Sequence, residues 1–90
     1  EEALTYLILG LCSEAGELAG KLKKIIRDNN GHVSMEKTIE LVEENGDCLW
    51  YVSQIATALG SSLSYTGKLN LDKLNSRLER GVLGGSGDNR

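Results

Sequence analysis

The sequence contains no proline and no phenylalanine, and aromatic residues make up only 4% of its 90 residues. A β-sandwich or β-barrel usually carries more aromatic residues and more turn residues between its strands. The chain also lacks the apolar run of about 18 residues that a membrane-spanning helix needs, and it shows no signal peptide. These absences argue against β folds and against a membrane partner.

Cysteine is scarce as well, with only Cys12 and Cys48. Their spacing fits neither a disulfide framework nor a C-x-x-C metal site, so we expect two reduced, buried thiols in a cytoplasmic protein. A chain of this length has a marginal core, and oligomerisation is a usual way to complete one. The net charge of −3 argues against a nucleic acid polymer as the main partner.

The apolar periodicity predicts three amphipathic helices, over residues 2–28, 35–59 and 62–80. Ser34 is the expected N-cap of the second helix, while Gly60 and Gly81 follow the ends of the second and third. Gly67 allows a break inside the third helix.

Two long helices and a short one do not close a four-helix core alone. We therefore expect an all-α bundle whose four-helix core is completed by dimerisation. The helical domain would span residues 1–83, and residues 84–90 form a glycine-rich tail of linker composition.

The first helix carries a near-heptad seam in which five of seven positions are Leu or Ile. The other two positions are Glu14 and Lys21. The full seam consists of positions 4, 7, 11, 14, 18, 21 and 25. Burying an unpaired carboxylate is costly, so Glu14 needs a cation, a metal or a water-filled cleft. A second apolar stripe consists of Ile8, Cys12, Ala15, Ala19, Leu22 and Ile26.

Two pairs of carboxylates have the same spacing on the two long helices. Glu14 and Glu17 are three residues apart, as are Glu44 and Asp47, so each pair projects from one helix face. If the helices pack antiparallel, four hard oxygen ligands would face each other and suit Mg²⁺, or Mn²⁺ as a substitute. With 13 acidic residues in the chain, such pairs also arise by chance on solvated faces, and spacing alone leaves both interpretations open.

The motifs around these acids resemble the MazG-like all-α nucleoside triphosphate pyrophosphohydrolases. Glu14-Ala15-Gly16-Glu17, 26 further residues and then Glu44-Asn45-Gly46-Asp47 are similar to that family's E-x-x-E…E-x-x-D signature. The runs Gly46–Tyr51 and Asn70–Leu74, the latter with Arg77 after it, resemble its second and downstream motifs.

The resemblance implies Mg²⁺-dependent hydrolysis of a (deoxy)nucleoside triphosphate to a nucleoside monophosphate and pyrophosphate, as nucleotide-pool house-cleaning. It implies a homodimer or homotetramer. Glu14, Glu17, Glu44 and Asp47 would act as catalytic metal ligands, with Glu14 the preferred general base. The residues expected to bind substrate are Lys73, Arg77, Tyr51, Asn70 and Lys21.

For several residues the sequence also allows a structural interpretation without a role in binding. Lys73 and Arg77 would otherwise form a solvated basic face at a helix end, and Lys21 would pair with Glu17. Trp50 either stacks on a base or packs in a core or interface, and His32 is expected to be exposed in a turn.

The two ends of the sequence bear on the base preference and on the role of the tail. The chain begins at Glu1 already in helical pattern, which is compatible with a natural segment preceding it. Because relatives often read the base there, no base preference is predicted. The tail resembles that of small relatives and is expected to order over a neighbouring active site, with Arg90 near phosphate.

Two other functions compete with the pyrophosphohydrolase. One is a non-catalytic α-helical oligomeric interaction module that has lost turnover. The other is a magnesium-dependent phosphatase that uses the same ligands and releases single phosphates.

Overall fold

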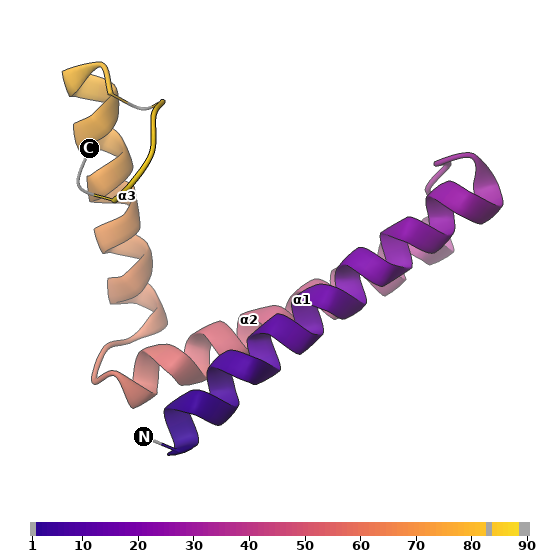
Figure 1. The fold of residues 1–90 in the computed structure, drawn as a ribbon, viewed down its shortest axis with the longest axis horizontal. Coiled ribbons are helices and arrows are strands. Elements are labelled where there is room, and N and C mark those ends of the chain that lie inside the picture. Colours follow the sequence, from indigo (N-terminus) through magenta and orange to yellow (C-terminus); the bar gives the residue numbers. More distant parts are fainter. Residues whose placement is uncertain (1, 83, 89–90) are drawn as a thin grey trace.

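The computed structural model describes residues 2–82 and 84–88, and these residues form three helices and no strand. They are α1 (Glu2–Asn29), α2 (Met35–Ala58) and α3 (Leu63–Arg80). α1 and α2 form a long antiparallel hairpin, and α3 leaves its open end at a steep angle (Figure 1). The predicted all-α class is confirmed.

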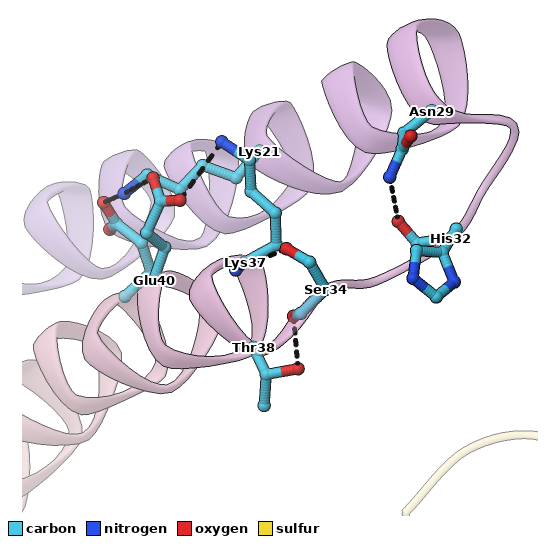
Figure 2. Close-up of polar contacts among 8 residues, drawn as sticks. Lys21, Asn29, His32, Ser34, Lys37, Thr38 and Glu40 are labelled. Atoms are coloured by element: carbon cyan, nitrogen blue, oxygen red, sulfur yellow. Dashed lines mark hydrogen bonds and ion pairs between the residues drawn. The ribbon is translucent and has the colours of Figure 1, made fainter.

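The turn between α1 and α2 is built from residues that tolerate a left-handed backbone. Asn30 and Gly31 have φ of 52° and 79°, and the amide of Gly31 donates to the carbonyl of Ile25 at 3.3 Å. The side-chain amide of Asn29 donates to the carbonyl of His32 at 3.0 Å (Figure 2). His32 itself is exposed, as expected for a turn residue.

Ser34 caps α2, as the sequence predicts. Its hydroxyl accepts a hydrogen bond from the amide of Lys37 at 3.2 Å, and its carbonyl accepts one from the hydroxyl of Thr38 at 3.0 Å (Figure 2). A capped start directly after a tight turn fixes the direction in which α2 returns along α1.

The seam of α1 is the face that packs against α2. Its members are half-buried or, for Ile25, buried: Leu4, Leu7, Leu11, Glu14, Leu18, Lys21 and Ile25. Further toward the open end of the hairpin, Gly10 lets the ring of Tyr51 approach α1, since a Cβ at position 10 would lie 2.2 Å from a carbon of that ring. The seam therefore brings Glu14 and Lys21 to the α1–α2 contact.

α3 is continuous from its cap to its last turn. The hydroxyl of Ser62 accepts from the amide of Tyr65 at 3.0 Å, and Gly81 closes the helix with φ of 72°. Gly67 lies inside without breaking it. Among the described residues α3 contacts α2 but has no close backbone contact with α1.

The single chain is open rather than compact. Its radius of gyration is 16.5 Å, whereas a compact chain of this length would have about 12 Å. Its accessible surface is 6837 Å², compared with roughly 5,100 Å² expected for its mass. In the part of the chain that is described, only Ile25 and Ala56 are buried hydrophobic residues.

The second apolar stripe of α1 is uncovered in this chain, because all its members are exposed. Cys12 lies on this stripe and is exposed, while Cys48 is half-buried. The expectation of two buried thiols is therefore wrong for the single chain, since the described residues leave this side of α1 exposed. No helix in the described ranges is both long enough and apolar enough to cross a membrane.

Candidate active site

Three carboxylates converge between the two long helices. Glu14 comes from α1, and Glu44 and Asp47 come from α2; one oxygen from each lies within 4.8 Å of the others. The convergence follows from the antiparallel hairpin, which places the two acidic pairs opposite each other. Three acids this close repel one another unless a cation lies between them.

The electrostatics of Glu14 reflect this crowding. The pKa of its carboxyl is raised, first by desolvation at its half-buried seam position and then by the charges of Asp47, Glu44 and Glu17. Both effects disfavour the ionised form. A divalent cation at the cluster would oppose both.

Glu44 offers a ligand atom that no described group uses. Its Oε2 is buried without a hydrogen-bond partner among the described residues, whereas its Oε1 lies 3.2 Å from the ammonium of Lys21. A buried carboxylate oxygen without a partner is unusual, since such groups are normally satisfied. The donor set of the cluster, hard oxygens only, fits Mg²⁺ or Mn²⁺.

Glu17 lies apart from this group. Its side chain is exposed, and it is not one of the three acids whose oxygens meet. It still contributes to the raised pKa of Glu14, so it lies near the edge of the cluster.

Lys21 bridges from α1 to α2 rather than along its own helix. Its ammonium lies 3.2 Å from Glu44 and 3.9 Å from Glu40, and Figure 2 shows it reaching toward Glu40 on α2. The hydrogen bond to Glu44 is the main reason its pKa is raised. Pairing with Glu17, the plainer alternative from sequence, is not what the structure shows, because the seam position turns Lys21 toward α2.

A cavity of about 350 Å³ lies on the hairpin beside Lys21, toward the turn. Its lining includes Lys21, Lys24, Lys37, Asp28 and Glu40, over the apolar side chain of Ile25. The three converging carboxylates do not line it. Lys21 is thus shared between the cavity and the acid cluster.

The two aromatic residues after Asp47 contact each other. The rings of Trp50 and Tyr51 are 5.0 Å apart and nearly perpendicular, which is a favourable edge-to-face arrangement. Tyr51 is half-buried against Gly10, and Trp50 is 55% exposed. Within this chain Trp50 is therefore not a core residue.

The structure does not bring the basic residues of α3 to the carboxylates. Lys73 and Arg77 lie on the far half of α3, which points away from the hairpin (Figure 1). Asn70 is exposed on the same helix. The predicted site residues therefore form two groups within one chain, one on the hairpin and one on α3.

The tail folds back onto α3 and supplies a partner that the sequence did not indicate. Both Lys73 and Arg77 contact Asp88, so the described part of the tail lies against its own helix. Arg90, expected near phosphate, lies outside the described residues. A glycine-rich segment has no periodicity, and therefore no sequence signal locates Asp88.

The comparison with protein families agrees with the motifs. The model of the MazG nucleotide pyrophosphohydrolase domain matches residues 2–82. The chain belongs to this family. The MazG match covers both acidic pairs and all of α3, and the residues after Val82 lie beyond it.

A phage protein is similar over almost the full MazG chain. The chain is 51% identical over 89 residues to the "Gene 37 protein" of Mycobacterium phage L5. The aligned region covers 99% of this chain and 78% of the phage protein. No solved structure matches the chain. Membership of the MazG family agrees with the all-α fold.

Proposed function

We propose that this chain hydrolyses (deoxy)nucleoside triphosphates to a monophosphate and pyrophosphate with Mg²⁺, as nucleotide-pool house-cleaning in the cytoplasm. The observation that supports it most is the convergence of Glu14, Glu44 and Asp47 from two helices in a chain of the MazG family. An interaction module would gain nothing from three mutually repelling acids.

The donor set supports a hard divalent cation. Glu14, Glu44 and Asp47 would hold it, the partnerless Oε2 of Glu44 is available to it, and Glu17 would join from one turn away. When bound, Mg²⁺ neutralises phosphate charge and lowers the pKa of a coordinated water.

Different residues of the hairpin would then take different roles in the hydrolysis. Water adds to a phosphorus of the α–β bridge, the bridging bond breaks, and Glu14 takes the proton of the water. Lys21 would exchange Glu44 for a phosphate oxygen, and Tyr51, which lies against Gly10 toward the open end of the hairpin, would contact the phosphate chain there.

Lys73, Arg77 and Asn70 would bind the phosphate chain from a second copy. In one chain α3 points away from the hairpin, so these residues reach a carboxylate cluster only if another copy supplies one. The accessible surface exceeds expectation by roughly 1,700 Å², whereas a standard interface takes about 800 Å² per partner. We therefore infer a homodimer, or a pair of dimers, whose core covers the exposed stripe of α1.

Product analysis tests this function. The protein is incubated with a panel of ribo- and deoxyribonucleoside triphosphates and Mg²⁺, and the products are separated by chromatography. Monophosphate with equimolar pyrophosphate is expected, and the panel reports the base preference. Orthophosphate as the first product would indicate a phosphatase, and no product with any nucleotide would favour the non-catalytic module.

A further inference from the structure

We propose that Asp88 is an internal anion that occupies the Lys73–Arg77 pair and is exchanged for a phosphate group of the ligand. The tail would thus act as a self-blocking contact at the phosphate-binding end of the site. The inference rests on the proposed function insofar as that function assigns phosphate to Lys73 and Arg77.

Two cations meet on one carboxylate oxygen of Asp88. The Lys73 ammonium donates to Oδ1 at 3.2 Å, and Nη2 of Arg77 lies 3.4 Å from the same atom. The two donors are one helical turn apart on α3, so their side chains converge on a single point. The pKa of Asp88 is lowered, mainly by its hydrogen bonds to Lys73 and Arg77.

The guanidinium of Arg77 is buried, unlike a solvated surface charge. It is only 4% exposed, and it is the one buried charged residue in the described part of the chain. Its Nη2 donates to the backbone carbonyl of Asp88 at 2.7 Å, and its buried Nε has no hydrogen-bond partner among the described residues.

The carboxylate of Asp88 leaves this guanidinium incompletely satisfied. Nε and Nη2 form one edge of an arginine, and Arg27 uses both atoms on Asp28, at 2.6 Å and 2.8 Å. Arg77 gives the carboxylate of Asp88 only one contact, of 3.4 Å, from Nη2. A phosphate group has more oxygens and more charge, so it can accept from Nε, Nη2 and Lys73 together.

Asp88 is also suited to leave. Its side chain is 83% exposed, and its ion pair with Lys73 is exposed on both sides, so that pair contributes little to stability. The segment before it contains Gly84, Gly85 and Gly87, with φ of 91° at Gly85 and 84° at Gly87. Residues 84–88 are all exposed, so the carboxylate can move away from α3 without uncovering an apolar core.

Binding of inorganic pyrophosphate without a divalent metal tests the exchange. Isothermal titration calorimetry of the full chain compares wild type with Asp88→Asn, which keeps the backbone carbonyl that Arg77 contacts. We expect Asp88→Asn to bind pyrophosphate at least threefold more tightly. Asp72→Asn, which removes an exposed acid of α3 paired with Lys68, should leave the affinity unchanged.

Two outcomes would overturn the proposal. One is equal or weaker binding by Asp88→Asn with circular dichroism unchanged, which would make Asp88 a residue that positions Arg77. The other is a gain that persists when Lys73→Gln is added, since the exchange requires the pair. The titration requires no turnover, so it can succeed even if the protein hydrolyses no nucleotide. Tighter pyrophosphate binding by Asp88→Asn together with an inactive wild type would reject the proposed function and leave the exchange proposal standing.

Discussion

At the scale of single residues, Glu14 is where sequence and structure agree most closely. The apolar seam of α1 makes a carboxylate at this position conspicuous, and the structure places it half-buried beside Glu44 and Asp47. Its raised pKa shows that the folded chain disfavours the charge there. A protein that keeps such a group unneutralised loses stability for it, which a bound cation would restore.

Replacing Glu14 with Gln should separate two effects of its charge: the destabilisation of the metal-free protein and the binding of the metal. Without metal, Glu14→Gln is expected to melt at the same temperature as wild type or higher, because a like charge leaves the cluster while the shape is kept. Saturating Mg²⁺ should stabilise wild type by about 2.7 kcal/mol at a hundredfold excess over Kd, and stabilise Glu14→Gln far less. Differential scanning calorimetry measures both.

The matched control is Glu79→Gln, which removes an exposed acid of α3. It should keep the full Mg²⁺-induced shift. If Glu14→Gln kept that shift as well, the metal would bind elsewhere and the assignment of the cluster would be wrong.

Residues outside a periodic pattern were harder to predict. Glu40, which pairs with Lys21, and Asp88, which pairs with Lys73 and Arg77, were not singled out from the sequence. Glu40 depends on the register between two helices, and Asp88 on the path of a glycine-rich tail. Neither is encoded in spacing along one element.

At the scale of the elements, the caps made the sequence informative. Ser34 caps α2 and Gly81 ends α3 as predicted, and every observed helix boundary lies within one residue of its prediction. These features are local, because a cap depends on a few neighbouring backbone groups. The possible break at Gly67 did not occur, since one glycine costs only about 1 kcal/mol in a helix.

Gly10 tests the packing of α1 on α2. Gly10→Ala places a methyl group inside the ring position of Tyr51, so the ring or the helix must shift, at a cost of roughly 1–3 kcal/mol. Gly67→Ala, where the added Cβ meets nothing within 4 Å, should instead stabilise by up to about 1 kcal/mol. Urea denaturation compares the two, and a stabilised Gly10→Ala would contradict the contact.

The contact between the tail and α3 predicts a pH dependence. The pKa of Asp88 is lowered by Lys73 and Arg77, so the contact stabilises the tail above the ordinary pKa of an aspartate, about 3.9. It is lost as the pH falls through the lowered folded-state value. A carboxyl-carbon NMR titration should give Asp88 a midpoint below the ordinary aspartate value, and a midpoint at or above that value would contradict the contact.

At the scale of the whole molecule, the direction in which α3 leaves the hairpin could not be predicted from the sequence. The apolar faces predicted a bundle, but a face does not state which surface it packs against. In one chain the exposed stripe of α1 and the leucines of α3 remain uncovered. The two predicted groups of site residues are separated for the same reason.

The open shape predicts an oligomer in solution. Sedimentation equilibrium should give the mass of a dimer or tetramer for wild type, and Leu22→Asp on the exposed stripe should shift it toward monomer and lower the melting temperature. Lys23→Asp, one residue away and also exposed, is the control and should leave the mass unchanged. A monomeric wild type at micromolar concentration would contradict the shared core.

The central claim is that the acidic cluster makes this chain a metal-dependent pyrophosphohydrolase. It is tested most directly by ³¹P NMR of one reaction, with chelator-treated protein and a nucleoside triphosphate to which Mg²⁺ is added during observation. The triphosphate signals should persist until Mg²⁺ is added and then give way to those of monophosphate and pyrophosphate in equal amounts. Turnover before the metal, orthophosphate as the first product, or unchanged triphosphate signals across the nucleotide panel would contradict the account.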